Sequence, residues 1–399
     1  MNANPIRLIL PIALAHLTIE LCNNYMPVVY PILIPTMGLT YAQVGLVTLV
    51  ASIGATLVQP LFGFLSDRWK PRRIVVASII WIGLLMGLVG LTRNYWLLIL
   101  LVGLGSLGSA AFHPAGATAA GSITTTRRGA TLSIFSVTGS LGTALSPLLI
   151  TVGLAWLGLS ATVLLIPIGL VVGLLLLRQS GWGGNAKAGS AHAGPGTTGG
   201  QAAVRAGSLV ALILVILMVM CRSWVQVSLI TYLPEWLQDQ GWTPARSSQM
   251  LTVLLVSITV GTLIGGTASD RIGRWPVLAL SLGLLGPALW FFFTGGAQLV
   301  WVALIGVLIG SSFPVTVVMA QDSWPDGVGL ASALVMGLGW LPGGIGASTT
   351  GLIADGSSLT TALLWLVIAP VLGLSFALMY ALVWTRHSER VPEVSKKPA

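Results

Sequence analysis

The chain has 399 residues, of which 55% are hydrophobic and only 7% are charged, with a mean hydropathy of +0.92. A soluble domain is usually about 25% charged, so this composition excludes a soluble protein. Because one membrane-spanning helix needs about 20 apolar residues, the length allows about a dozen spans with short connections. Little is left for a separate catalytic domain.

The net charge is +9, from 19 basic and 10 acidic residues. The basic residues can be placed in loops on one side of the predicted membrane, so they indicate orientation and not a nucleic-acid partner. The two cysteines, Cys22 and Cys221, fall within apolar runs, so neither a disulfide framework nor a spaced metal site is expected.

Apolar runs bounded by glycine, proline and charged residues predict twelve spans. The first run is too long for the core of a signal peptide, and His16 and Glu20 interrupt it, so we expect it to remain as a span. The predicted spans cover residues 6–33, 42–65, 74–92, 95–119, 129–153 and 159–178, then 208–233, 246–269, 276–294, 298–320, 328–353 and 359–385.

The segment 179–206 contains GGNAKAGSAHAGPGTTGG and has no apolar periodicity, which predicts a flexible cytoplasmic linker. We therefore expect one six-helix bundle over 1–178, a second over 207–385, and a cytoplasmic tail over 386–399.

The two halves repeat one another. GFLSDRWKPRR, from Gly63, recurs as GTASDRIGRWP, from Gly266, and the triplet that begins at Phe112 recurs as the triplet that begins at Ser312. Parallel repeats of this kind place a substrate site near the midplane of the bilayer, between the halves.

The basic residues also predict the orientation. Of the 19 Lys and Arg residues, 16 fall in segments on the side of the amino terminus, Arg93 and Arg246 fall on the opposite side, and Arg222 lies within a span. Since the positive side is cytoplasmic, we expect a multi-pass protein of the bacterial inner membrane with both termini in the cytoplasm.

Ionisable side chains at membrane depth cost at least about 2 kcal/mol each, so each needs a partner or a function. His16 and Glu20 are four residues apart, which places them on one face of the first helix, where they can share or relay a proton. The alternative is a structural hydrogen bond between them. We favour proton coupling because apolar residues could replace a structural pair at lower cost.

Arg222 lies about midway along the seventh predicted span. Its guanidinium stays charged, and its planar fork suits a carboxylate or a phosphate-like group. The repeat offset places Glu20 at a matching depth, so we expect Glu20 to neutralise Arg222 in the empty site and its protonation to free Arg222 for an anionic substrate. The alternative is a permanent ion pair that locks the halves together.

Other polar and aromatic residues are candidates for substrate binding. His113 precedes a proline in the fourth span, and a proline exposes backbone carbonyls that are tolerated only beside a cavity or buried protein. The remaining candidates in the same cavity are Asn24, Tyr25, Trp224 and Tyr232. No ligand-spaced cluster predicts a metal site.

The repeated loop motif supplies candidates for a gate. Asp67-Arg68 and Asp270-Arg271 fall at cytoplasmic helix ends, where an acid can pair with a neighbouring helix in one conformation and release it in another. A solvated loop charge is the alternative, and recurrence in both halves argues against it. The fifth span contains GSLGTALSP, from Gly139, and the eleventh contains GWLPGGIG; both permit close helix packing.

The two halves and the repeated loop motif resemble the major facilitator superfamily across nearly the whole chain. AHLTIELCNNYMP, FHPAGA, RSWVQVSLITYLPEWL and MAQDSWPDGVGLASALVMGLGWLPGGIGA are more narrowly similar to the fosmidomycin resistance protein group. The resemblance implies an all-α membrane protein with twelve transmembrane helices in two pseudo-symmetric six-helix bundles. It also implies an exporter that works by proton antiport, with small phosphonate antibiotics among its cargo.

In that family the first, fourth, seventh and tenth helices line the cavity. The candidates that the resemblance places on or near these helices are His16, Glu20, His113, Arg222 and Gln321.

Two features depart from the family pattern. Lys70-Pro71 stand where the superfamily often has Gly-Arg, which leaves Asp67 and Arg68 of the gate intact. The fifth span lacks the full GxxxGPxxGG pattern of antiporters, which weakens the expected direction of transport without affecting the fold.

The sequence therefore predicts a proton-coupled exporter of small anionic compounds that works as a monomer, since one chain supplies both halves. A proton symporter that imports an organic anion and a lipid-handling membrane protein are the alternatives. We expect no enzyme, because there is no nucleophile elbow or soluble catalytic domain. We expect no cofactor, and the absence of a Walker-type phosphate loop favours the proton gradient as the energy source.

Overall fold

A computed structural model describes residues 5–66, 69–123, 128–178, 206–324, 331, 334–335 and 341–390. Within these ranges every regular element is a helix. The helices of the first half are α1 (Pro5–Asn23), α2 (Met26–Met37), α3 (Tyr41–Thr56), α4 (Gln59–Ser66), α5 (Pro71–Leu88), η1 (Val89–Leu91), α6 (Tyr95–Gly121), α7 (Arg128–Leu157), η2 (Gly158–Leu164) and α8 (Leu165–Arg178).

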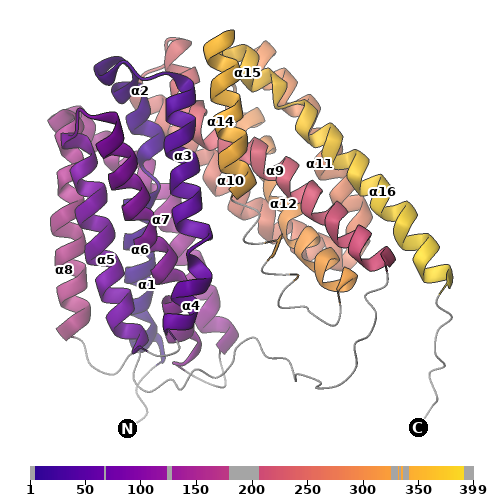
Figure 1. The fold of residues 1–399 in the computed structure, drawn as a ribbon, viewed down its shortest axis with the longest axis horizontal. Helices are drawn as coiled ribbons and strands as arrows, with labels where there is room; N and C mark the ends of the chain where they lie inside the picture. The colour runs from indigo at the N-terminus through magenta and orange to yellow at the C-terminus, as the bar shows by residue number, and fades with distance from the viewer. Residues whose placement is uncertain are drawn as a thin grey trace.

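The helices of the second half are α9 (Ala206–Asp239), α10 (Pro244–Ile272), α11 (Arg274–Gly295), α12 (Leu299–Ser323), α14 (Leu341–Gly356), α15 (Leu359–Trp365) and α16 (Ile368–Arg390). Figure 1 shows the two halves as neighbouring helical bundles that approach each other at the upper end of the view. The predicted linker over 179–206 lies almost entirely outside the described residues.

Nine stretches of the described chain are long and apolar enough to cross a membrane. One of them, Thr131–Arg178, has 48 residues and contains both α7 and α8, so it is long enough for two crossings. The first predicted span corresponds to α1 with α2, and the described part of the eleventh includes α14. The described helices thus fit the twelve predicted spans.

The first span is broken where the sequence analysis predicts one helix. α1 ends at Asn23 and α2 begins at Met26, directly before Pro27. Proline has no N–H to continue the hydrogen-bond ladder and is favoured in the first turn of a helix, so Pro27 marks the start of α2. The backbone oxygen of Glu20 near the end of α1 accepts both the Asn24 side-chain amide at 2.8 Å and the Asn24 N–H at 3.1 Å.

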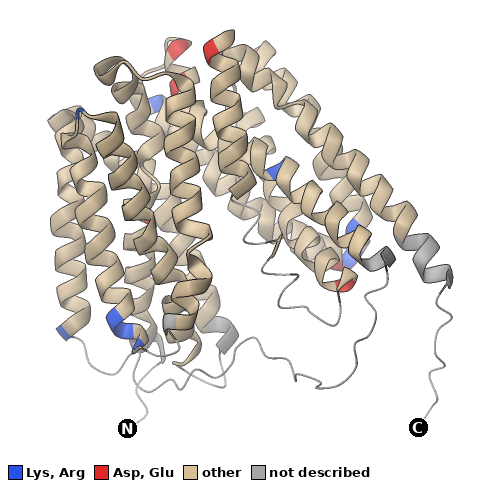
Figure 2. Cartoon of the chain, in the orientation of Figure 1, with Lys and Arg blue, Asp and Glu red and all other residues tan. Residues whose placement is uncertain are grey.

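The start of α1 and the end of α16 lie at one end of the bundles, at the bottom of Figure 1. The connections between α2 and α3 and between α14 and α15 lie at the opposite end, which we call the far end. Figure 2 shows that most charged residues lie near the helix ends. The predicted orientation would make the far end extracytoplasmic.

The two halves are joined at the far end through α3 and α14. Both carboxylate oxygens of Asp355 accept hydrogen bonds from the first turn of α3, from the Tyr41 N–H at 2.8 Å and the Ala42 N–H at 2.9 Å. Tyr232 donates to the backbone oxygens of Tyr41 at 2.8 Å and of Ala347 at 3.0 Å. The structure is therefore closed at this end.

Close helix packing reinforces this closure. A side-chain Cβ at Gly351 would lie 2.3 Å from the backbone oxygen of Tyr41 and 2.5 Å from the hydroxyl of Tyr232. Only glycine permits the two helices of opposite halves to approach this closely.

We expect Asp355→Ala to shift the protein toward opening at the far end, because the substitution removes a carboxylate that caps a helix N-terminus. Loss of such a cap costs about 0.5–2 kcal/mol, which corresponds to about a two- to thirtyfold change in the ratio of closed to open molecules. The measurement is the distance between spin labels at Arg93→Cys and Gln298→Cys, on exposed loops of opposite halves, in a background in which Cys22 and Cys221 are replaced by alanine.

Ser357→Ala is the matched control for this experiment, because Ser357 is exposed just after α14 and its hydroxyl donates to the backbone oxygen of Ile353 in the last turn of that helix. Unchanged distances in Asp355→Ala would show that the cap does not hold the far end closed.

Candidate functional site

The partly buried acid Glu20 is surrounded by polar side chains, most of them from three helices of the first half. Its Oε1 lies 3.5 Å from Nε2 of His16, one turn earlier on α1, and 3.2 Å from Nε2 of His113 on α6. Its Oε2 accepts hydrogen bonds from Asn24 at 2.8 Å and from Thr143 on α7 at 3.2 Å. Both oxygens of the carboxylate therefore have partners, and one oxygen is shared by two imidazoles.

His16 is fixed in one orientation. Its Nδ1 lies 2.7 Å from the backbone oxygen of Phe135 on α7, and the imidazole stacks on the Phe135 ring with centroids 3.9 Å apart. A carbonyl oxygen can only accept a hydrogen bond, so Nδ1 carries a proton and Nε2 faces Glu20. A proton on Glu20 or on this Nε2 can therefore be shared between the two groups.

His113 connects the cluster to a less buried region. Its Nε2 contacts Ser109 at 3.1 Å as well as Glu20, and 32% of its side chain is exposed, against 13% for Glu20. His113 is thus the member of the cluster that is best placed to exchange a proton with water.

The same three side chains form the group that could hold a metal ion. One ligand atom from each of His16, Glu20 and His113 lies within 4.8 Å of the others. The sequence analysis expects no ligand cluster because the residues are far apart in the chain; the packing of α1 against α6 brings them together. Two imidazoles and one carboxylate form a donor set that suits a transition metal as well as a proton.

The spacing between α1 and α7 depends on glycine. A Cβ at Gly139 would lie 2.3 Å from the His16 ring, and a Cβ at Gly142 would lie 2.4 Å from the backbone oxygen of Leu17. The glycine-rich stretch of the fifth predicted span therefore allows α7 to pack directly against the His16–Glu20 face of α1.

Arg222 lies in a separate environment in the second half. It is 6% exposed, donates from Nη1 to Gln226 at 2.5 Å, and stands over the Phe313 ring of α12 with 5.1 Å between the guanidinium carbon and the ring centroid. Its Nε is buried and has no hydrogen-bond partner. Among the described residues no acidic side chain forms an ion pair with Arg222.

The expected neutralisation of Arg222 by Glu20 is therefore not observed in this structure. Glu20 is paired with two histidines of its own half, and Arg222 is supported by a neutral amide and an aromatic face. The sequence analysis missed Gln226 and Phe313 as partners. The spacing of four residues between Arg222 and Gln226 was a signal for the first, whereas the second follows only from packing.

The other predicted substrate contacts have different surroundings. Asn24 donates to Glu20 and so belongs to the polar cluster around that carboxylate. Tyr25 is fully buried and donates to Met86 at 2.6 Å, Trp224 donates to Thr350 at 3.0 Å, and Tyr232 holds the far-end closure. Gln321 is partly buried on α12. The structure brings none of these side chains into hydrogen-bond contact with Arg222, and their roles in substrate binding stay predictions.

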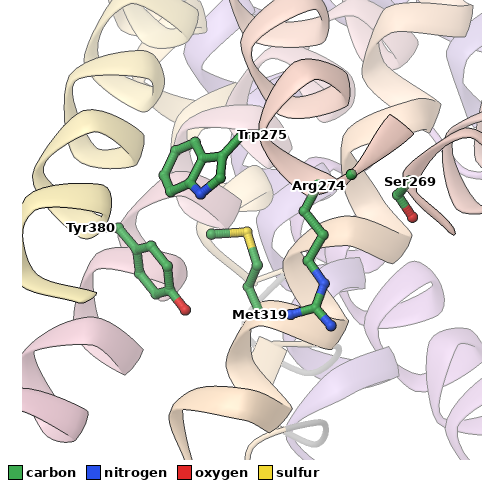
Figure 3. Close-up of a pocket in the computed structure, with 6 residues that line it drawn as sticks. Ser269, Arg274, Trp275, Met319 and Tyr380 are labelled. Carbon is green, nitrogen blue, oxygen red and sulfur yellow. The ribbon is translucent and has the colours of Figure 1, made fainter. Parts of the chain in front are cut away.

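Of the predicted gate residues, Asp67 and Arg68 lie outside the described residues. Asp270 and Arg271 are exposed at the end of α10. At the same end Arg274 of α11 forms an ion pair with Asp322 of α12, beside a pocket lined by Ser269, Trp275, Met319 and Tyr380 (Figure 3). This ion pair links two neighbouring helices of the same half and is absent from the sequence predictions.

The helical architecture, the apolar spans and the buried ionisable groups define an integral membrane protein of the transporter class. The chain belongs to the Major Facilitator Superfamily, whose model matches residues 12–243 and 211–399. This family consists of transporters and not enzymes, so the predicted fold class and the predicted absence of an enzyme are confirmed, and the protein is a secondary transporter.

The chain is similar to curated proteins over most of its length. It is 28% identical to the fosmidomycin resistance protein of Escherichia coli (strain K12) over 369 residues, which cover 91% of this chain and 90% of that protein. It is 29% identical to the uncharacterised MFS-type transporter YfnC of Bacillus subtilis (strain 168) over 374 residues, again with 91% and 90% covered.

Solved structures share the fold. A bacterial homologue of the human lysosomal transporter Spinster, in an inward-facing and unoccupied conformation, aligns with a TM-score of 0.81 and 15% identity, covering 97% of this chain and 98% of that one. The nucleoside transporter NupG, as a point mutant, aligns with a TM-score of 0.78 and 15% identity, covering 93% and 99%.

We expect Gly139→Ala to lower the melting temperature of the purified protein, because the new methyl group would overlap the His16 ring, which Phe135 holds in place. Overpacking of this kind costs about 1–3 kcal/mol. Gly283→Ala on α11 is the matched control, because nothing lies within 4 Å of its Cβ position. Equal melting temperatures for the two variants in detergent would show that α1 and α7 are not tightly constrained here.

Proposed function

We propose that this protein is a proton-coupled antiporter that exports small anionic compounds, phosphonate antibiotics among them. The observation that carries the proposal is the separation of a buried guanidinium from a partly buried carboxylate. Arg222 in the second half has no acidic partner among the described residues, while Glu20 in the first half is held by two imidazoles. An anionic cargo supplies the counter-charge that Arg222 lacks, and a proton neutralises Glu20.

The cargo class is supported by similarity. The Escherichia coli relative is named for resistance to fosmidomycin, and the alignment with it covers 91% of this chain. The chemistry of Arg222 agrees with such a cargo, because a guanidinium binds planar or tetrahedral oxyanions through paired hydrogen bonds. Its unpartnered Nε is available as a further donor.

The balance of charge favours exchange. Counting only the charges of the cargo, Arg222 and Glu20, a monovalent anion on Arg222 together with an ionised Glu20 gives the site a net charge of −1. A proton on Glu20 with an empty Arg222 gives +1. An inside-negative membrane potential contributes about 2.3 kcal/mol per charge per 100 mV, and it favours outward movement of the first state and inward movement of the second.

The far-end closure is compatible with export. In this family the halves rock about a site near the midplane, which opens alternately to the two sides. With the predicted orientation, a far end closed by Asp355 and Tyr232 is the state that loads cargo from the cytoplasm. Proton binding after release of the cargo then returns the carrier to this state.

We expect the purified protein in liposomes to take up fosmidomycin when the lumen is more acidic than the outside, because protons leaving the lumen drive exchange in either orientation of the protein. Glu20→Gln should reduce this uptake at least about tenfold, because it removes the titratable carboxylate but keeps the hydrogen bonds from Asn24 and Thr143. Arg222→Ala should weaken cargo binding about tenfold or more, since hydrogen bonds to charged groups contribute about 1.5–3 kcal/mol.

Arg93→Ala serves as the control for loss of an arginine, because its side chain donates only to the adjacent Thr92 oxygen. Uptake driven by an acidic outside, and not by an acidic lumen, would identify a symporter and overturn the antiport proposal.

The membrane potential gives a second prediction. At equal pH on both sides, a lumen-positive potential should accelerate uptake of a monovalent anion by the antiporter, because anion entry and proton exit both move negative charge inward. A symporter of one proton with one monovalent anion moves no net charge, so a rate that does not respond to a potassium diffusion potential would contradict the charge states given above.

A further inference from the structure

The far end carries a second buried acid that the proposed mechanism does not use. Glu235 on α9 is 8% exposed, and its Oε2 is buried without a hydrogen-bond partner. Its neighbours in the closure are better satisfied: Asp355 accepts two backbone N–H groups, and the exposed Asp239 accepts the Tyr41 hydroxyl at 3.4 Å.

The position of Glu235 follows from helical spacing. Tyr232, Glu235 and Asp239 are three and four residues apart, so they share one face of α9. Tyr232 and Asp239 both contact Tyr41 of α3, in the opposite half. Glu235 therefore lies on the face of α9 that is covered when the two halves close. The next residue, Trp236, packs on Phe292 and Phe293 of α11, on another face.

The charged and titratable groups around this face are mostly acids and phenols. Tyr41 of α3 is close enough to interact electrostatically with both Glu235 and Asp239, and α14 contributes Asp355. Tyr30 of α2 contacts the Thr48 hydroxyl of α3, and Thr48 in turn contacts Thr231 of α9.

The basic group contributed by α10 does not offset these acids. Arg246 is exposed and stands over the Trp242 ring at 5.6 Å. In the described part of the chain it forms no ion pair with an acid. An ionised Glu235 would thus be buried with an oxygen that receives no hydrogen bond, beside another carboxylate. Burying an unpaired charge costs several kcal/mol, and a neutral acid in the same place costs far less.

We propose that Glu235 is a second proton-binding site, which takes up a proton from the far side when the two halves close there and returns it when they open. In the open state the face of α9 is in water, and the carboxylate is ionised. Since the closed state binds the extra proton, a lower pH on the far side favours closure. Asp355 has the opposite requirement, because both of its carboxylate oxygens accept N–H groups from the first turn of α3.

The place of this site in the cycle rests on the proposed function. With the far end facing outward, external acidity would return the empty carrier to the state that loads cargo. The site itself concerns only opening and closing, so it can be tested without any substrate.

The experiment measures spin-label distances between Arg93→Cys and Gln298→Cys, in the background without Cys22 and Cys221, at pH 6.0 and pH 8.5. We expect the open fraction of the otherwise unchanged protein to rise at least about fivefold at the higher pH. Glu235→Gln, which keeps the shape of the side chain without its charge, should stay closed at both values and change by less than about twofold. Glu235→Asp restores a carboxylate and should restore the response, which also shows that the position tolerates substitution.

Glu20→Gln separates this proposal from the proposed function. A pH response that persists in Glu235→Gln and disappears in Glu20→Gln would place the responsible proton among the side chains around Glu20. That result would overturn the Glu235 site and leave the antiport proposal intact. Distances that do not change with pH in the unsubstituted protein would also overturn the Glu235 site. Loss of the response in Glu235→Gln alone would establish it.

Discussion

A carboxylate inside an apolar bundle needs hydrogen-bond donors on every side, and the arrangement of the first half follows from that requirement at Glu20. Its two oxygens contact His16 of α1, Asn24 directly after that helix, His113 of α6 and Thr143 of α7. For these groups to meet, α7 must lie against α1 without an intervening side chain, which the glycines of GSLGTALSP permit. The hydrogen bonds to the Glu20 carboxylate therefore depend on the close packing of α7 against α1.

The two halves share an architecture but carry different charged groups. The first half places a carboxylate between two imidazoles, and the second half places a guanidinium over an aromatic ring. Neither half neutralises the other in this conformation. Under the proposed function, two unlike charges at corresponding places let the transporter accept one ion in each half, whereas a permanent ion pair between the halves would block both.

Composition and apolar periodicity were sufficient to predict the membrane fold, and the family match confirms it. The break between Asn23 and Met26 was within reach of the sequence, because Pro27 and the polar pair before it mark a helix boundary. His16 and Glu20 could be placed on one face from their spacing alone. The partnership with His113 could not, because it depends on how α1 and α6 cross, which the spacing of residues along one helix does not specify.

The expected contact between Glu20 and Arg222 shows the same limit. A repeat offset identifies corresponding places in two halves, but it does not say how far apart those places are in a given conformation. Gln226 lies one turn from Arg222, but the sequence analysis did not identify it as a partner, because a neutral amide carries no charge that would balance the guanidinium. Glu235 was overlooked because it lies close to a predicted helix end, where an acid is usually solvated; α9 continues to Asp239, and the closure of the halves buries it.

Asn24 lies at the break in the first span, and one nitrogen of its side chain donates both to the backbone oxygen of Glu20 and to the Glu20 carboxylate. The same amide therefore contacts both the last turn of α1 and the carboxylate of Glu20. A change at Glu20 alters one of the two acceptors that compete for this nitrogen, and the other acceptor belongs to the last turn of the helix. The chemical state of the Glu20 carboxyl group is in this way coupled to the conformation of the main chain at the break in the first span.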